Sequence, residues 1–270
     1  MKYGKYLLTF LFIVFGLSNL SAQYDFMQRT NGDFWAGMGS GMTLSFSAPN
    51  RASFYSHARG GRSGTYSIEH EYGIPFLHLN WDDGTFSRYL MLVNEDIIAL
   101  YADNTEPSWK AGWSYFGNGS TGRAFPIMGS ITASSSLRWG NIHFAATAER
   151  LGLHINRVWA VEGGVGERLY ITLPNQFAGS LFISSGYVHF SRPYLFQANA
   201  RPKRIRITSA RNETEFFEVE LCDTPNFQTI SFDANGMGEH ENIILEILEI
   251  YSGTRYNHMA INSILGSFSQ

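Results

Sequence analysis

Hydrophobic and polar residues alternate in short runs through the first half of the chain. In residues 42–46 the side chains of Met42, Leu44 and Phe46 fall on one face, as in a strand with one buried side. Similar runs occupy residues 52–55, 65–68, 74–79, 89–93 and 97–101. Residues 82–84, Asp-Asp-Gly, are a tight-turn signature between two of them. We therefore predict that residues 23–104 form an antiparallel β-meander of about six strands, curled into a small barrel or sheet.

Alternation resumes in the second half of the chain, where two charged runs can be paired. Residues 201–208 and 215–221 both alternate charged and apolar side chains. Antiparallel pairing around Asn212 sets these residues opposite one another: Ile205 and Val219, Ile207 and Phe217, Arg204 and Glu220, Arg206 and Glu218. Aligned opposite charges favour a sheet with one wet face. Residues 228–232 also fit a strand, and residues 243–251 fit a buried strand or, by periodicity alone, a helix. The natural architecture is a jelly-roll β-sandwich.

Composition agrees with an all-β protein. The chain has 270 residues, of which 44% are hydrophobic and 16% charged, so it can bury a core and is not disordered. It contains 21 Phe, 14 Tyr, 6 Trp and 27 Gly, which favours strands filled by aromatic side chains and joined by turns. The formal net charge of −3 gives no general attraction to nucleic acid or anionic membranes.

The N-terminus has the pattern of an export signal. Lys2 and Lys5 precede an apolar stretch over residues 7–17, which is short for a membrane span. Cleavage after Ala22 would leave a signal peptide of residues 1–22 and no transmembrane segment, whereas an uncleaved anchor is the alternative. The single cysteine, Cys222, excludes intramolecular disulfides and is expected to be a buried small hydrophobe. These features predict a bacterial protein that is periplasmic, on the cell surface or secreted.

Residues 105–127 separate the two halves. Glycines and prolines interrupt any strand pattern there, while Trp109, Trp113, Tyr115 and Phe116 make the segment too aromatic for a free linker. We predict a connector that packs against one or both halves.

An ordered series of motifs marks the second half. It begins with Trp159, the glycines 163, 164 and 166, and Glu167, and continues through the motifs Ser185-Gly186-Tyr187, Tyr194, Asn199-Ala200-Arg201, Gln228-Thr229-Ile230, Tyr251-Ser252-Gly253, Tyr256 and Ile261. In order and spacing this series resembles the NADase-type glycan-binding domain, the discoidin-like F5/8 type C domain attached to NAD glycohydrolases. The resemblance covers residues 128–270. It implies a galactose-binding-like β-sandwich that binds glycan and carries no catalytic residue.

Sugar recognition needs flat aromatic faces together with planar polar groups that hydrogen-bond hydroxyls. Exposed loops of the second half supply both kinds, and the candidate ligand-binding residues are Trp139, Asn141, Glu162, Tyr187, Arg192, Tyr194, Asn199, Arg201 and Tyr256. Two alternatives stand beside this set. Trp159 is expected in the core, and Asn199 and Arg201 can instead lock their loop through hydrogen bonds to its backbone.

The chain departs from the family pattern where acidic residues are usual. Residues 145–150 read Ala-Ala-Thr-Ala-Glu-Arg, so only Glu149 remains of a run that the resemblance would fill with aspartates. His258 and Ser263 occupy later acidic positions. A calcium site built from those acids is therefore in doubt, and we expect neither a metal nor another cofactor.

No catalytic motif is found. None of the eight histidines forms an HExxH pair, residues 239–241 fit a solvated turn, and the glycine-rich residues 37–41 lack the ending of a phosphate loop. Three hypotheses remain: an exported glycan-binding protein, a cell-envelope structural or protein-binding component that has lost its sugar site, and an unrecognised hydrolase. The hydrolase would use residues of the first half, namely His57, Glu69, His70, Glu71, His78, Asp82 and Asp83.

Overall fold

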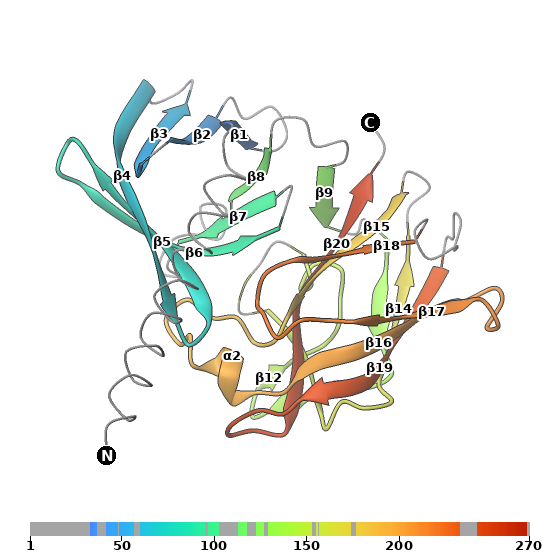
Figure 1. The fold of residues 1–270 in the computed structure, drawn as a ribbon. Coiled ribbons are helices and arrows are strands. Elements are labelled where there is room, and N and C mark those ends of the chain that lie inside the picture. Colours follow the sequence, from blue (N-terminus) through green and yellow to red (C-terminus); the bar gives the residue numbers. More distant parts are fainter. Residues whose placement is uncertain are drawn as a thin grey trace, which may run out of the picture.

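The computed structural model consists of a closed β-barrel followed by a β-sandwich, and Figure 1 shows the two side by side. It describes residues 33–36, 42–47, 49–56, 60–94, 97–102, 113–117, 123–126, 129–152, 155, 157–173, 177–232 and 242–268. The predicted signal peptide, His57 and residues 37–41 and 239–241 lie outside these ranges. The described part contains one short helix, α2 (Leu195–Ala198), so the all-β prediction is confirmed.

Eight strands form the barrel in simple up-and-down order. They are β1 (Asp33–Ala36), β2 (Met42–Ser47), β3 (Arg51–Ser56), β4 (Gly60–Glu71), β5 (Ile74–Trp81), β6 (Phe86–Val93), β7 (Ile97–Tyr101) and β8 (Trp113–Gly117). Each strand pairs antiparallel with the next, and β8 closes the ring on β1. The six predicted strands are confirmed as β2 to β7, and closure of the meander into a barrel removes every sheet edge.

Alternation along these strands decides what fills the barrel. Leu44 and Phe46 of β2 point inward, as the pattern of residues 42–46 predicted, and both are buried. The other buried members of the interior are Ala52, Tyr66, Leu77, Leu79, Trp81, Met91, Ile98 and Leu100. An eight-stranded barrel is just wide enough for its own side chains. The described interior is therefore a packed core.

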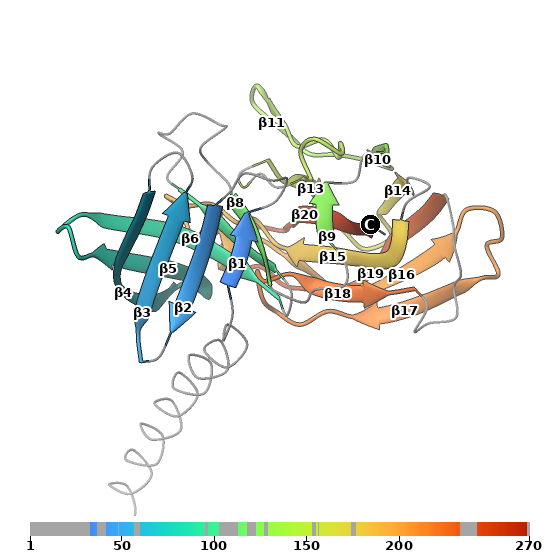
Figure 2. The same cartoon turned by 90° about the horizontal axis from the view of Figure 1, so that it is seen from above.

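The sandwich consists of two antiparallel sheets. One has the order β10-β14-β19-β16-β17 and the other β13-β20-β15-β18, with β9 pairing β20. The bounds are β9 (Arg123–Pro126), β10 (Ile131–Ala133), β13 (Trp159–Glu162), β14 (Arg168–Thr172), β15 (Phe177–Ser185), β16 (Arg201–Ser209), β17 (Phe216–Glu220), β18 (Gln228–Ser231), β19 (Asn242–Tyr251) and β20 (His258–Phe268). A separate hairpin, β11 (Arg138–Trp139) and β12 (Ile142–His143), projects from the sandwich (Figure 2).

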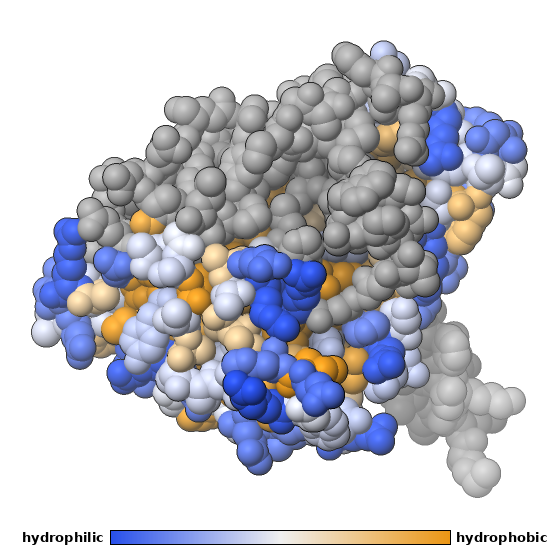
Figure 3. Space-filling view, turned by 180° about the vertical axis from the view of Figure 1, so that it is seen from behind, coloured by the Kyte–Doolittle hydropathy of each residue, from blue (hydrophilic) through white to orange (hydrophobic). Residues whose placement is uncertain are grey.

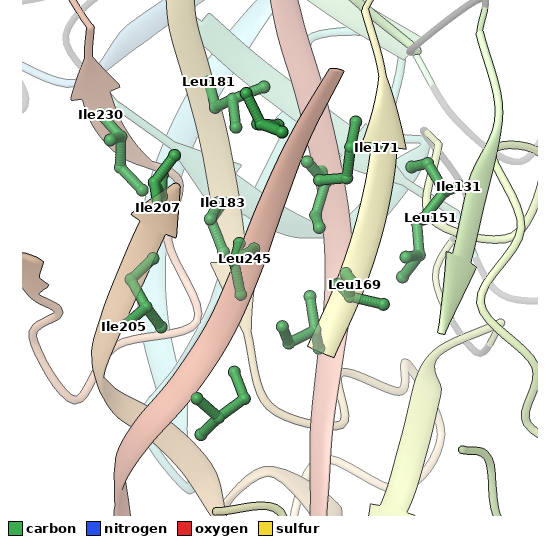
Figure 4. Close-up of a cluster of buried hydrophobic side chains, with 14 of the residues drawn as sticks. Ile131, Leu151, Leu169, Ile171, Leu181, Ile183, Ile205, Ile207, Ile230 and Leu245 are labelled. Atoms are coloured by element: carbon green, nitrogen blue, oxygen red, sulfur yellow. The ribbon is translucent and has the colours of Figure 1, made fainter. Parts of the chain in front are cut away.

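Branched aliphatic side chains from both sheets interlock between them, as the close-up in Figure 4 shows. Ile205 and Leu245 come from one sheet, and Leu181 and Ile183 come from the other. Trp159 is fully buried in this core and donates its indole N–H to the carbonyl oxygen of Ser135 at 2.9 Å. Its predicted place in the core is confirmed.

The pairing predicted around Asn212 is confirmed residue by residue. Arg204 lies opposite Glu220 and Arg206 opposite Glu218, and the two apolar pairs predicted with them alternate with these charged pairs. On the wet face the Arg206 guanidinium contacts Glu218 at 2.8 Å, and Arg204 contacts both Glu218 at 2.9 Å and Glu249 at 2.6 Å. The run 243–251 is strand β19. A ladder of alternating charge therefore covers this sheet.

One cysteine prediction is wrong. Cys222 follows β17, but its side chain is exposed. Its backbone N–H and C=O pair with the side-chain amide of Gln228, at 2.6 and 3.1 Å. The backbone thus forms the structural contact at this strand end, and the thiol is left at the surface.

A second hydrophobic cluster, here called the shared core, joins the barrel to the sandwich. Its barrel members lie on the outer face of β5 to β7, and its sandwich members come mainly from β15, β20 and the loops around α2. They are Ile74, Phe76, Leu90, Leu92, Ile97, Ala99 and Tyr101 from the barrel, and Ile155, Phe182, Val188, Phe190, Phe196, Phe227 and Leu265 from the sandwich. All are buried. The two halves therefore share apolar packing of the kind found within a single domain.

Polar contacts reinforce the shared core at its edge. The Phe227 N–H donates to the Val93 carbonyl at 3.1 Å, and the Val93 N–H donates to the side-chain oxygen of Asn226 at 3.2 Å. Arg88 of the barrel lies over the ring of Phe76 at 3.9 Å and near the ring of Phe190 at 5.3 Å. Its guanidinium also pairs with Glu71.

The segment predicted as a connector contributes a strand to each half. Within residues 105–127, β8 closes the barrel and β9 pairs with β20 of the sandwich. The expectation that no strand forms there is wrong. Glycine and proline interrupt the pattern on either side of these strands, so each run is too short for period-two alternation to show.

Candidate functional site

The β11–β12 hairpin presents the most exposed tryptophan among the described residues. Trp139 is 59% exposed and Ile142, directly opposite in the pair, is 55% exposed. Between them Gly140 has φ +57, a conformation that a two-residue hairpin needs and glycine adopts without strain. The hairpin is tied to β13 at its root, where the Leu137 N–H donates to the Ala160 carbonyl at 2.7 Å. The indole is thus held outward on a fixed support.

Three rings meet beside the hairpin. The ring centroids of Trp139 and His258 are 5.6 Å apart in an edge-to-face arrangement, and His258 stacks on Tyr256 with centroids 6.1 Å apart and planes 4° apart. The Arg255 guanidinium lies 5.2 Å from the centroid of Tyr256. We call Trp139, His258 and Tyr256 the ring cluster. Such pairs are favourable arrangements of aromatic quadrupoles.

The loop that carries Tyr256 is fastened to α2. The carbonyl of Ala198 accepts hydrogen bonds from the N–H groups of Arg255 at 3.1 Å and Tyr256 at 2.8 Å. A Cβ on Gly253 would lie 2.5 Å from the Ala198 oxygen, so only glycine lets the two backbones approach this closely. The Gly253 of the sequence motif therefore positions Tyr256.

Glu162 completes the surface. It lies opposite His258 in the β13–β20 pairing and is exposed. The turn after it is held by the Gly163 N–H, which donates to the Asn257 carbonyl at 2.9 Å. Gly164 has φ +103, and a Cβ there would lie 2.5 Å from the Cβ of Met259. This glycine turn fixes the carboxylate beside the ring cluster.

This surface offers aromatic faces, one carboxylate and one guanidinium at a rigid end of the sandwich. Aromatic faces stack on the C–H faces of a sugar, and planar polar groups accept or donate hydrogen bonds in pairs. Figure 2 places the hairpin on the side of the molecule that faces the viewer in Figure 3, where hydrophobic patches lie among strongly hydrophilic side chains. Of the predicted residues, the structure brings together Trp139, Asn141 in the hairpin turn, Glu162 and Tyr256.

Tyr187 lies beneath the hairpin. Its half-buried ring meets Phe144 edge-on at 6.1 Å, and Phe144 is hydrogen-bonded to the hairpin root through Leu137. Burial raises the pKa of Tyr187, and the nearby positive charges of Arg192 and Arg150 partly offset the rise. Tyr187 thus supports the site, with Arg192 exposed beside it.

Three other predicted ligand residues make contacts away from the ring cluster. The ring of Tyr194 lies 6.3 Å from that of Tyr72 of the barrel. Asn199 is buried and donates its amide N–H to the Leu195 carbonyl at 2.9 Å. Arg201 is buried, pairs with both oxygens of Asp223 and donates to the carbonyl of Asn199 at 2.7 Å. Both side chains hydrogen-bond the backbone of their own loop, as the alternative interpretation expected, and ligand contact by Asn199 and Arg201 stays a prediction.

The residues at the positions that are acidic in the family pair with protein groups in this chain. Glu149 pairs with Arg157 at 2.6 Å. Ser263 is buried and donates to the carbonyl oxygens of Leu151 at 3.1 Å and Gly152 at 2.6 Å. Within the described ranges no three His, Cys, Asp or Glu side chains gather in a way that would hold a metal ion. Packing and hydrogen bonds order this loop.

The residues of the hydrolase hypothesis form ordinary surface pairs. Glu69 contacts His78 at 3.6 Å, Glu71 pairs with Arg88, and Asp82 pairs with Arg51 at 2.7 Å. Arg51 also lowers the pKa of Asp82 by hydrogen bonding to its carboxylate. Asp83 accepts hydrogen bonds from the backbone N–H of Thr85 at 2.9 Å and from its hydroxyl at 2.5 Å, the arrangement of a turn.

His258 is the site residue that the sequence did not single out. In the chain it appears only as a replacement for an acid, while in space it links Trp139 to Tyr256. Tyr256 lies two residues before His258, the first residue of β20, and an i, i+2 spacing of this kind is a usable signal. The approach of Trp139 depends on sheet pairing and could not be read from the sequence.

The fold and this surface define an all-β protein with a discoidin-like β-sandwich. The chain belongs to the NAD glycohydrolase translocation F5/8 type C domain family, whose model matches residues 126–266. The structure is also similar to a fucose binding module of Streptococcus pneumoniae, with 13% identity and a TM-score of 0.34 over 57% of this chain and 99% of that chain. So slight a likeness carries no argument about function. No curated protein matches the chain.

Within the described residues, none of the helices has the length and apolar character needed to cross a bilayer.

Proposed function

We propose that the protein binds carbohydrate at the ring cluster without catalysing a reaction. The observation that carries the proposal is the exposed Trp139, held edge-on to the stacked pair of His258 and Tyr256 with Glu162 beside them. Membership in an F5/8 type C family supports it. The indole of Trp139 is 59% exposed on the hairpin. Its contact with water is unfavourable, so covering the indole with the apolar face of a sugar would stabilise the complex.

The test is binding of the full-length mature chain to a broad glycan array, followed by titration of the best ligand. Trp139→Ala should weaken binding about tenfold, because an aromatic contact contributes roughly 0.5–1.5 kcal/mol in addition to the apolar area that it buries, and about 1.4 kcal/mol is tenfold. Tyr170→Ala is the matched control, since Tyr170 is 43% exposed on strand β14. It should bind as the parent does, and both variants should keep the parental melting temperature within about 2 °C.

Two outcomes would count against the proposal. One is a folded chain that binds no glycan. The other is capture of a stoichiometric cell-envelope protein that Trp139→Ala loses and no saccharide displaces. That second result would assign the same surface to a protein partner, the alternative that the exposed Ile142 at the hairpin favours.

We further propose that the protein is exported through its N-terminal segment and acts in the periplasm, at the cell surface or outside the cell. The support is the pattern of Lys2, Lys5 and the apolar residues 7–17. Fractionation with N-terminal sequencing tests it. A mature chain that begins at Gln23 is expected, and an unprocessed chain confined to the cytoplasm would contradict it.

A further inference from the structure

A second depression lies on the outer face of the barrel, over β2, β3 and β4. It encloses about 590 Å³, within the range of small-ligand sites. Four hydroxyl side chains line it, with two aromatic residues, one glycine, one arginine and one aspartate: Thr43, Ser45, Ser53, Ser63, Phe54, Tyr55, Gly61, Arg62 and Asp82. None of these residues belongs to the ring cluster, and the family model does not reach this part of the chain. We call it the hydroxyl groove.

The register of the barrel aligns its hydroxyls. Ser45 lies opposite Ser53, and Ser53 lies opposite Ser63. Neighbouring strands are about 4.8 Å apart, so three serines form a row about 10 Å long across the sheet. Thr43 lies one row away, opposite Tyr55. A row of donors and acceptors at this spacing suits the hydroxyls of consecutive sugar residues.

Tyr55 supplies a flat face at the end of the groove. It is 49% exposed, and its partner across the strands is Gly61. A Cβ on Gly61 would lie 3.6 Å from the ring carbon Cδ2 of Tyr55, so the ring rests on the glycine backbone. One side of the ring is thereby supported while much of its surface stays in water, as a stacking contact requires.

The charges around the groove are balanced. Arg51 makes a bidentate pair with Asp82, with N–O distances of 3.1 and 2.7 Å. Arg62 lies 4.1 Å above the ring of Trp81. Hydrogen bonds from Thr85 lower the pKa of Asp83, and the charge of Arg62 lowers it further. Two arginines are thus matched by two aspartates. Such a site has no net attraction for phosphate, sulfate or a metal cation.

We propose that the hydroxyl groove is a second saccharide site, specific for a neutral glycan chain. The hydroxyl row and the Arg51–Asp82 pair hydrogen-bond the sugar hydroxyls, and Tyr55 stacks on a sugar face. The site does not depend on the ring cluster, and the two can be tested separately.

The experiment uses the full-length chain carrying Trp139→Ala, which removes the ring cluster from the measurement. Calorimetric titration is made with three neutral probes, cellohexaose, xylohexaose and mannohexaose, and with anionic hexagalacturonate as a comparator. We expect saturable binding of at least one neutral hexasaccharide and weaker binding of hexagalacturonate. Adding Tyr55→Ala should reduce that affinity at least tenfold. Adding Phe86→Ala should not, since Phe86 is 56% exposed on β6 and outside the groove lining.

Three results would overturn the proposal: no binding of any neutral probe, tighter binding of hexagalacturonate, or equal affinity with and without Tyr55→Ala. A further pair of variants separates stacking from hydrogen bonding. Ser53→Val should weaken binding while Ser53→Thr should retain it, since the two introduced side chains have nearly the same volume and only threonine keeps the hydroxyl. Loss of binding by Trp139→Ala alone, with Tyr55 intact, would instead place all saccharide binding at the ring cluster.

Discussion

Substitution of Phe190 tests whether the barrel and the sandwich share one core. Phe190 is 6% exposed, meets Phe76 edge-on at 5.5 Å and lies near the Arg88 guanidinium. Replacing a buried phenylalanine by alanine costs about 3–5 kcal/mol of unfolding free energy. The lower end applies here, because Phe190 is not completely buried. We expect Phe190→Ala to lose about 3 kcal/mol, including the aromatic pair with Phe76.

Calorimetry and urea denaturation of the full chain measure the loss. For a unit of this size 1 kcal/mol corresponds to roughly 2–4 °C, so the melting temperature should fall by about 6–12 °C. Phe86→Ala is the control, because that ring is exposed on the same barrel and should cost under about 1 kcal/mol. Equal losses in the two variants would refute a shared core. So would a parent that melts in two separate steps with only one of them moved by Phe190→Ala.

Two further predictions concern the sandwich. Gly164→Ala should lower the melting temperature clearly more than Gly84→Ala, because both glycines have positive φ but only Gly164 would bring a Cβ into contact, with Met259; equal shifts would contradict this. Glu218→Gln should reduce the decrease in unfolding free energy that the parent shows as the pH falls. Hydrogen bonding from Arg206, with the charges of Arg204 and Arg206, lowers the pKa of Glu218 in the folded state. Its contribution is therefore present above the unfolded pKa of about 4.3 and is lost as pH falls through the lower folded value.

Urea denaturation across the range pH 2–7 checks the second of these. Parent and Glu218→Gln should converge at the acid end and differ at neutral pH, where the parent is more stable. Glu213→Gln is a suitable control, since Glu213 is exposed in the turn between β16 and β17. A parent and a Glu218 variant with parallel pH profiles would show that this carboxylate contributes nothing.

Most strands could be predicted from the sequence because one face of each is buried. In β2 and in the β16–β17 pair, period-two alternation and opposite charges gave both the strand and its register, since a slip by one residue would turn apolar side chains to water. The sequence left a closed barrel and a curled sheet as alternatives and could not decide between them. Closure depends on β1 and β8, whose runs are too short to show a period.

The candidate site could be predicted only in part. Trp139 and Tyr256 stand out as aromatic residues in polar loops, but their meeting through His258 depends on the pairing of β20 with β13. The burial of Arg201 could not be predicted, because the sequence around it is the same whether its guanidinium faces solvent or pairs with Asp223. Residues far apart in the chain decide such cases.

The joint between barrel and sandwich also bears on how the chain would engage a polymer. Because apolar packing fixes the two halves as one solid, the hydroxyl groove and the indole of Trp139 are held at a constant distance and angle. Bivalent attachment then gains from effective concentration only when the polymer presents its segments at that distance. Stiff or regularly arrayed glycans would bind both sites at once, whereas a flexible glycan chain would occupy only one site at a time.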